Sequence, residues 1–409
     1  MKSTGIVRQV VLFSVIVLAV AGCTRTTGHA SSSGYHWVGT WASSAQEVET
    51  KLMPSAFQKL DDTTLRQVVR VSIGGGKLRV RFSNAFADWQ DSLNISEACI
   101  AVSAGGNAVK PETVKPLTFG GNASVVIPYG TLFVSDPVDF DLKPGSDLAV
   151  TMHIAKAPKK TTGHRSARGE AVFIQSGNAV SEKSLPTSVA NTCWYYLCGV
   201  EVLANHSAAA VVCLGDSITD GKGSTEGQNR RWPDYLARRL RANTETAAIG
   251  VLNQGIGGNC LWSGGIGQPV MQRLDRDVLA QPGARWVILL AGINDLGGGR
   301  TAPEEIIISM EQIAVRLQAC GLRVYGSTIL PCGGSFYYNN ELEAKRLKIN
   351  DWIRTSGIFD AVIDWDAVVC DPTDPSRLRP EADSGDHLHL SDEGYRMMAE
   401  AVDIKLLLN

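Results

Sequence analysis

The stretch VVCLGDSITDGKG (residues 211–223) runs from an apolar segment directly into a turn that carries one serine, Ser217. A continuous apolar run that ends in glycine is typical of a parallel strand buried on both faces. Open α/β sheets place their active sites outside the carboxyl ends of such strands. Ser217 is therefore a candidate nucleophile, provided that the rest of the chain supplies a base, a group that orients the base, and oxyanion donors.

From about residue 206 onward, short apolar runs alternate with segments of helical periodicity. The predicted strands lie at 208–215, 248–255, 285–292, 322–330 and 359–365. The predicted helices lie at 230–243, 271–281, 303–320, 339–357 and 391–407. This alternation predicts a three-layer α/β domain with a parallel sheet over residues 206–409.

The preceding segment, residues 36–205, has short β-like runs separated by Gly, Pro and Asn. In KLRVRF (77–82) apolar side chains alternate with Arg79 and Arg81. This alternation predicts a sheet with one buried and one solvated face. We therefore expect an all-β sandwich or jelly-roll-like domain here, without a catalytic cluster of its own.

The N-terminus has the features of an export signal. A basic start precedes a short apolar run, which ends in Val20-Ala21-Gly22-Cys23 and resembles a bacterial lipobox. We expect residues 1–22 to be a lipoprotein signal peptide, Cys23 to carry the lipid, and residues 23–35 to be a tether. The protein would then be exported and held in the periplasm or at the cell surface by its lipid anchor alone. A plain secretory signal is the alternative.

Composition narrows the classes of partner. The formal net charge of the 409 residues is −2 and no long basic stretch occurs, so a nucleic-acid partner is not expected. The eight cysteines other than Cys23 are scattered and form no CxxC pair, so a structural zinc site has little support. Cys193 and Cys198 are near enough in sequence to form a short disulfide in an oxidising compartment.

Polar loops follow the predicted strands and precede the last helix. They are the Ser217 turn, NQGIGGN (253–259), AGIND (291–295) and DSGDHLHLSDEGY (383–395). Each is an ordinary turn sequence by itself. Because strand-end loops meet at one edge of a parallel sheet, we expect them to form one active site together.

The order of these motifs resembles the four signature blocks of the SGNH (GDSL) hydrolase superfamily. The matching segments are Gly215-Asp216-Ser217, Gly258, Gly292-Ile293-Asn294-Asp295 and Asp386-His387-Leu388-His389. The longer phrases around them resemble a subgroup in which a β-rich domain precedes the catalytic one. The resemblance implies a flavodoxin-like SGNH hydrolase fold and ester hydrolysis by a serine nucleophile, with no cofactor or metal.

Roles for the matching residues follow from the chemistry of ester hydrolysis. Ser217 would attack the carbonyl, His389 would take its proton and pass it to the leaving alcohol, and Asp386 would orient the imidazole. The backbone N–H groups of Ser217 and Gly258 and the side-chain amide of Asn294 would stabilise the oxyanion.

Other assignments within the last motif are less favoured. His387 competes with His389 as the base, and Asp383 competes with Asp386 as the orienting group. A metal site made of Asp386, His387 and His389 would lack a second cluster to complete its coordination shell. The DxxH spacing and the resemblance favour Asp386 and His389.

The substrate is the least determined feature. Tyr337 and Tyr338 in GGSFYYNN (333–340) would stack on a sugar ring or pack over the sheet edge. The Gly-rich, polar loops predict a shallow, hydrated cleft, which favours removal of acetyl or other short acyl groups from a small molecule or polysaccharide. A lipase or arylesterase is the alternative enzyme. A non-catalytic glycan-binding lipoprotein is disfavoured because the complete set of motif residues is present.

Overall fold

The computed structural model describes residues 1, 34–169, 172–299 and 301–408. Nearly all of the predicted signal peptide and tether, and Cys23, the predicted lipidation site, lie outside the described residues. Tyr35–Asn409 form one compact unit, which contains both predicted domains.

No helix within the described parts of the chain has the length and apolarity that crossing a bilayer requires.

The α/β part contains a five-stranded parallel sheet. Its strand order is β18-β17-β19-β20-β21, and the first strand in sequence lies second in the sheet, as in flavodoxin-like folds. The bounds are β17 Ala209–Gly215, β18 Ile249–Gly255, β19 Ala284–Leu290, β20 Arg323–Ser327 and β21 Ala361–Ile363. All four pairings are parallel, so the predicted fold class of this part is confirmed.

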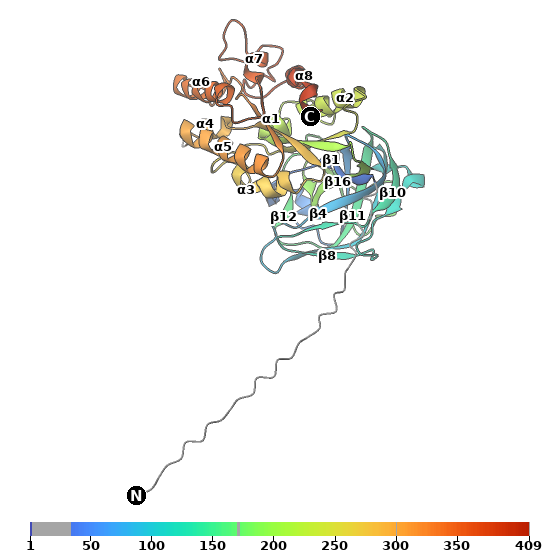
Figure 1. Cartoon of the computed structure of the whole chain (residues 1–409). Coiled ribbons are helices and arrows are strands. Elements are labelled where there is room, and N and C mark those ends of the chain that lie inside the picture. The colour runs from blue at the N-terminus through green and yellow to red at the C-terminus, as the bar shows by residue number, and fades with distance from the viewer. Residues whose placement is uncertain (2–33, 170–171, 300, 409) are drawn as a thin grey trace. The chain divides into compact units, whose positions relative to one another are not determined.

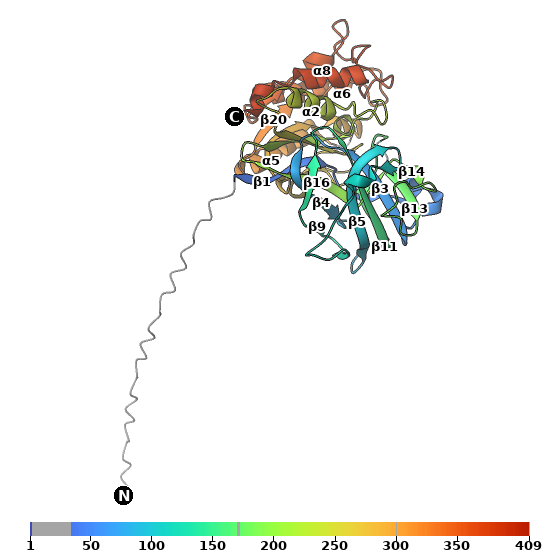
Figure 2. The ribbon, with the colours of Figure 1, turned by 90° about the vertical axis from the view of Figure 1, so that its right-hand side faces the viewer.

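Helices flank this sheet, with α2 packed on β18 and α8, and α5 packed on β20 and α6 (Figures 1 and 2). Their bounds are α1 Ser217–Asp220, α2 Trp232–Ala242, α3 Val270–Leu274, α4 Ile293–Gly297, α5 Pro303–Ala319, α6 Asn340–Thr355, α7 Trp365–Val369 and α8 Asp392–Ala401. One π-helical turn, Asp275–Leu279, continues α3. The Ser391 hydroxyl caps α8 by accepting from the Gly394 N–H at 3.2 Å.

The β-rich part consists of antiparallel sheets, drawn in blue to green in Figure 1. One sheet joins β1 Tyr35–Ala42, β16 Leu197–Asn205, β4 Gly75–Ser83, β10 Val138–Leu142 and β9 Leu132–Val134. The largest joins β14 Val189–Asn191, β13 Val172–Ser176, β3 Thr63–Arg70, β11 Asp147–Lys156, β5 Ser92–Gly105, β6 Ala108–Val109, β7 Lys115–Pro116 and β8 Val125–Pro128. A small sheet joins β15 Trp194–Tyr195, β12 Thr161–His164 and β2 Gln46–Val48. The predicted all-β architecture is confirmed.

The prediction that one face of β4 is solvated is wrong at Arg81. Arg81 is 6 % exposed, and its guanidinium donates to the Ala280 carbonyl at 3.1 Å and pairs with Glu201 at 3.5 Å. At Arg81, this face of β4 therefore lies against the α/β part of the chain, whereas Arg79 on the same face remains partly exposed. Strand alternation separates the two faces of a sheet, but it does not reveal what covers each face.

The predicted option of a Cys193–Cys198 disulfide is not realised. Both thiols are free, and they donate to different carbonyls, Cys193 to Arg165 at 3.3 Å and Cys198 to Arg81 at 3.5 Å. Burial raises the pKa of each thiol to about 11.

Hydrogen bonds connect the β-rich part with the edge strand β18 and with the segment that precedes β19. The Val251 N–H donates to the Ser72 hydroxyl at 3.0 Å, and the Gly39 N–H donates to the Pro282 carbonyl at 2.9 Å. A Cβ at Gly250 would lie 2.2 Å from the Gly39 carbonyl oxygen, so only glycine permits this approach. The edge strand thereby has polar partners that an exposed edge would lack.

A fully buried arginine, Arg273 on α3, connects both parts of the chain. Its guanidinium donates to the carbonyls of Gly215 and Gln254, each at 2.9 Å, and to the Ser44 hydroxyl at 3.0 Å. It also pairs with Asp277 at 3.0 Å. The carboxyl ends of β17 and β18 are therefore held by one charged group.

We predict that Arg273→Met lowers the free energy of unfolding by roughly 3–5 kcal/mol, because it leaves buried carbonyls and Asp277 without this donor. The matched control is Arg276→Met, which removes a partner of the same aspartate; the Arg276 side chain is 24 % exposed. The control should cost about 1 kcal/mol or less. Urea unfolding curves measure both values, and equal losses would contradict the assigned role of Arg273.

Candidate active site

Ser217 lies where β17 turns sharply into the short helix α1. A Cβ at Gly215 would lie 2.3 Å from the Thr219 hydroxyl and 2.4 Å from the Leu290 carbonyl oxygen, so the turn requires glycine there. Asp216 caps α1 by accepting from the Ile218 N–H at 2.9 Å. The turn places Ser217 at the carboxyl edge of the sheet, as predicted.

His389 approaches Ser217 from the loop that precedes α8. Its Nε2 lies 2.9 Å from the Ser217 Oγ, and its Nδ1 lies 2.7 Å from Asp386 Oδ2. Asp386 Oδ1 accepts from the backbone N–H groups of Leu388 and His389 at 3.0 and 2.8 Å. With its proton on Nδ1, the imidazole can accept the serine proton at Nε2.

The competing residues form a separate pair. His387 Nδ1 lies 2.5 Å from Asp383 Oδ2, and the His387 side chain is 46 % exposed. The loop therefore contains two His–Asp pairs, of which only the one with His389 contacts the candidate nucleophile. Within the described parts of the chain, no group of three His, Cys, Asp or Glu side chains is placed to hold a metal ion.

The predicted oxyanion donors line the same pocket as Ser217. Gly258 has φ +73°, a conformation that favours glycine. The Asn294 amide donates to the Asn259 carbonyl at 3.0 Å, and its oxygen accepts from the Tyr337 hydroxyl at 3.1 Å. These bonds fix the orientation of the amide and leave it a second N–H.

The two tyrosines predicted to contact substrate differ. The ring of Tyr337 packs over Gly297, where a Cβ would lie 2.4 Å from it, and the residue lines the pocket. Tyr338 is partly buried against the core and does not line the pocket. Phe336, which the sequence interpretation passed over, lines the pocket and is 77 % exposed.

The pocket has a volume of about 550 Å³ and draws on both parts of the chain. The β-rich part contributes five lining residues that no sequence motif indicated: Gln46, Leu52, Arg165, Ser166 and Arg168. Four of the lining side chains are apolar: Leu52, Ile266, Phe336 and Leu388. The expected hydrated cleft therefore has an apolar lining beside its polar one, because long-range packing brings these side chains beside the polar loops.

Arg168 and His164 connect the β-rich part to α1 through Asp220. The Arg168 guanidinium pairs with one Asp220 oxygen, and His164 Nε2 lies 3.0 Å from the other. Burial alone would raise the pKa of Asp220, but the charge of Arg168 and the hydrogen bond with His164 bring it below its usual range. Arg168 has φ +50°, a left-handed backbone conformation that is strained for a long side chain.

Electrostatics favour the neutral imidazole at His389. Burial lowers the pKa of His389, the neighbouring Asp386 opposes this shift, and the charges of Arg168 and Lys222 add to it. The net pKa lies below its usual range. A base with such a pKa remains unprotonated, and therefore able to accept a proton, to lower pH than an ordinary histidine.

A parallel flavodoxin-like sheet with a serine at its first strand end and a His–Asp pair before its last helix defines the class of SGNH-type hydrolases. Residues 213–397 match the GDSL-like Lipase/Acylhydrolase family, so this part of the chain is a GDSL-like acylhydrolase domain.

Solved structures of this kind cover about half of the chain. The lipase/acylhydrolase from Enterococcus faecalis is 21% identical, with a TM-score of 0.41, covering 49% of this chain and 97% of that one. The GDSL-like lipase from Bacteroides thetaiotaomicron is 21% identical, with a TM-score of 0.36 and coverages of 49% and 87%. Est24, a carbohydrate acetylesterase from Sinorhizobium meliloti, is 16% identical, with a TM-score of 0.38 and coverages of 49% and 98%. No curated protein matches. Similarities at this level leave the substrate open.

We predict that Arg168→Met moves the acid limb of the kcat/KM profile to higher pH. Removing a cation that lowers the pKa of His389 must raise that pKa, so protonation will inactivate the base earlier as pH falls. Lys222→Met should act in the same direction, whereas Arg323→Met, at an exposed position on β20, should leave the limb in place. A limb that moves to lower pH in Arg168→Met would refute the assigned electrostatic effect.

Proposed function

We propose that the protein is a serine ester hydrolase in which Ser217, His389 and Asp386 act as one catalytic unit. The observation that carries this proposal is the continuous chain of hydrogen bonds from the Ser217 hydroxyl through His389 to Asp386. The match of residues 213–397 to an acylhydrolase family supports the same reaction class.

The reaction begins when Ser217 Oγ attacks the ester carbonyl and its proton moves to His389 Nε2. The carbonyl oxygen becomes an oxyanion, which the N–H groups of Ser217 and Gly258 and the Asn294 amide stabilise. Collapse breaks the bond to the alkoxy oxygen, and His389 returns the proton to the departing alcohol. Water then repeats the sequence on the acyl-enzyme, and the acid and free serine are released.

We predict that Ser217→Ala and His389→Ala each lower kcat on p-nitrophenyl acetate by several orders of magnitude, and that the double variant is no slower than the worse single variant. Because the two residues act in the same step, removing the second after the first causes no further loss of rate. Asn294→Ala should lose roughly 10²–10³-fold in kcat because one oxyanion donor disappears. His387→Ala is the matched control for the histidine and should retain activity. A double variant far slower than either single one would overturn the proposed unit.

For the substrate, we propose short acyl groups, acetyl above all, on carbohydrate. Polar side chains able to bind sugar hydroxyls, including Gln46, Ser166 and Lys222, line the pocket beside Phe336, whose exposed ring offers a stacking surface. The apolar lining residues Leu52, Ile266 and Leu388 support a second candidate, an arylesterase, because apolar side chains could hold an aromatic leaving group.

We predict that activity on p-nitrophenyl esters falls as the acyl chain lengthens beyond a few carbons, and that acetate is released from acetylated saccharides. The pocket can surround a small acyl group, but a long chain would extend into water and gain less from burial. Rates that rise toward long chains would favour a lipase. Rapid turnover of phenyl acetate without release of acetate from any acetylated saccharide would favour the arylesterase.

A further inference from the structure

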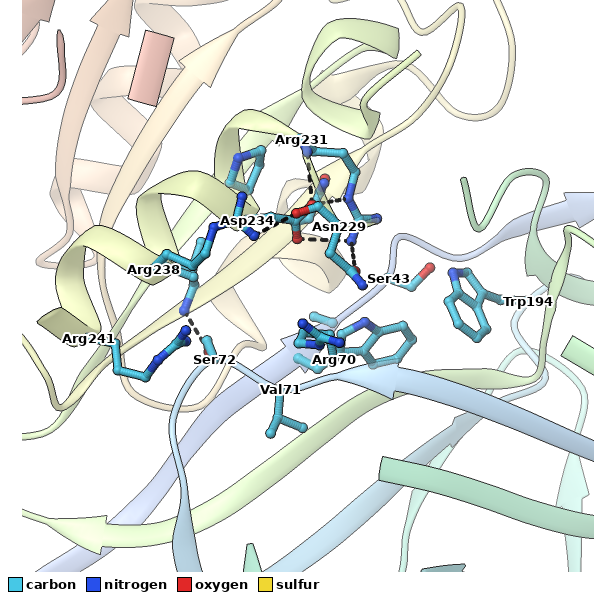
Figure 3. A pocket seen from close by; sticks show the side chains of 16 residues that line it. Ser43, Arg70, Val71, Ser72, Trp194, Asn229, Arg231, Asp234, Arg238 and Arg241 are labelled. Atoms are coloured by element: carbon cyan, nitrogen blue, oxygen red, sulfur yellow. Dashed lines mark hydrogen bonds and ion pairs between the residues drawn. The ribbon is translucent and has the colours of Figure 1, made fainter. Parts of the chain in front are cut away.

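The catalytic pocket has an adjoining cavity at the candidate oxyanion donors. The adjoining cavity has a volume of about 520 Å³, and Gly258, Asn294 and Tyr337 line both spaces. The small cavity between the β-rich part and helix α2 differs, because it shares no lining residue with the catalytic pocket (Figure 3). A carbonyl oxygen bound by the Gly258 N–H and the Asn294 amide would therefore lie where the catalytic pocket and the adjoining cavity meet.

The two substituents of an ester carbonyl have different requirements in this site. The departing alkoxy oxygen must come within reach of His389 Nε2, which returns the proton to it. His389 lines the catalytic pocket and does not line the adjoining cavity. The alcohol portion of the ester therefore occupies the catalytic pocket, and the adjoining cavity is available to the acyl portion.

The adjoining cavity is lined by small and polar residues. Its described lining contains four glycines and the hydroxyl side chains of Ser263 and Thr301, and it contains no Leu, Ile, Val, Met or Phe. The lining of the catalytic pocket includes four apolar side chains. A chain of methylene groups would gain little from entering a polar space, whereas a hydroxyl can exchange its hydrogen bonds with water for hydrogen bonds with the protein.

Thr301 supplies an independent observation at the adjoining cavity. The residue is only 7 % exposed, and its hydroxyl makes no hydrogen bond with any of the described residues. Buried hydroxyls almost always have a partner, so an unpartnered one in the wall of a cavity indicates a molecule inside that cavity. A hydroxyl both donates and accepts, which suits a second hydroxyl as its partner.

The wall that carries the second hydroxyl, Ser263, is held in place by the protein. Asp295 accepts from the Trp262 N–H at 3.1 Å, and the Ile266 N–H donates to the Gly258 carbonyl at 2.8 Å. These bonds fix the segment on both sides of Ser263. The cavity therefore has its shape before a substrate binds, which lowers the entropic cost of binding.

We propose that the adjoining cavity is an acyl subsite for short, hydroxyl-bearing acyl groups, in which Thr301 and Ser263 bind the acyl hydroxyl. This inference rests on the proposed ester hydrolysis and names the acyl group that the site favours. An acetyl group is too short to fill the cavity, whereas a 3-hydroxybutyryl group can carry its hydroxyl into it. The chemical steps are unchanged: the bond from the acyl carbon to Ser217 Oγ forms, the bond to the alkoxy oxygen breaks, and water later releases the hydroxy acid.

The test compares each enantiomer of ethyl 3-hydroxybutyrate with ethyl butyrate on the whole protein, by titration of the acid that is released. The ratio of the two kcat/KM values is divided by the ratio of the two rates of hydrolysis by hydroxide, which removes the intrinsic reactivity of the esters. We predict a corrected ratio of about three or more for one enantiomer, because a hydrogen bond between neutral groups contributes roughly two- to tenfold.

Matched variants identify the residues that bind the acyl hydroxyl. Thr301→Val keeps the branched shape and removes the hydroxyl, so it should lower the corrected ratio by roughly two- to tenfold. Ser263→Ala should change the ratio in the same direction, and its exposed position makes it a second test if the buried Thr301 variant does not fold. Thr187→Val, at an exposed position outside the cavity lining, should leave the ratio unchanged. Each ratio is measured within one variant, so a general loss of activity cancels.

Three results would overturn the acyl subsite. The first is a corrected ratio near one for both enantiomers in the unaltered protein. The second is an unchanged ratio in both Thr301→Val and Ser263→Ala. The third is an effect of these variants that is confined to acetylated saccharides, which would assign the two hydroxyls to the alcohol portion.

Turnover of p-nitrophenyl acetate distinguishes failure of this inference from failure of the proposed function. If the unaltered protein hydrolyses that ester but shows one of the three results, the acyl subsite is refuted and the ester hydrolase stands. If it hydrolyses no ester, both proposals are refuted.

Discussion

The buried guanidinium of Arg273 determines how the strand ends meet. It binds the carbonyls of Gly215 and Gln254, and Ser217 follows only two residues after the first of these. A buried charge must be neutralised and hydrogen-bonded, so it tolerates few alternative arrangements of its partners. Its bond to Ser44 extends the same constraint to the β-rich part. The position of Ser217 therefore depends on packing between both parts of the chain, as well as on the turn that carries it.

The β-rich part contributes charged and polar side chains to the candidate catalytic pocket, as well as contact area. Arg168 and His164 bind Asp220 at the end of α1, and Arg168 also acts electrostatically on His389. A hydrolase domain with the same motifs but without this part would lack the cations on that side of its pocket. The lining of the pocket is therefore formed jointly by the polar loops of the sheet and by residues that precede them in the chain.

The surroundings of the arginines differ across this molecule. Arg273 is completely buried, and each of its bonds is internal, so it holds the structure together. Arg241 is half-buried, and burial together with the positive charges of Arg238 and Arg70 lowers the pKa of its guanidinium. The first arrangement is typical of a structural charge.

The sequence alone determined the parallel sheet and the pairing of Asp386 with His389. Both depend on short-range features: the periodicity of apolar runs specifies strands and helices, and a spacing of three residues lets one loop hold both side chains together. It did not reveal the burial of Arg81, the Tyr337 hydrogen bond to Asn294, or the lining contributed by Arg168. These features arise from contacts between segments far apart in the chain. The pattern of apolar residues predicts that a face will be buried, but it does not predict which surface will cover that face. Tertiary packing alone decided those contacts.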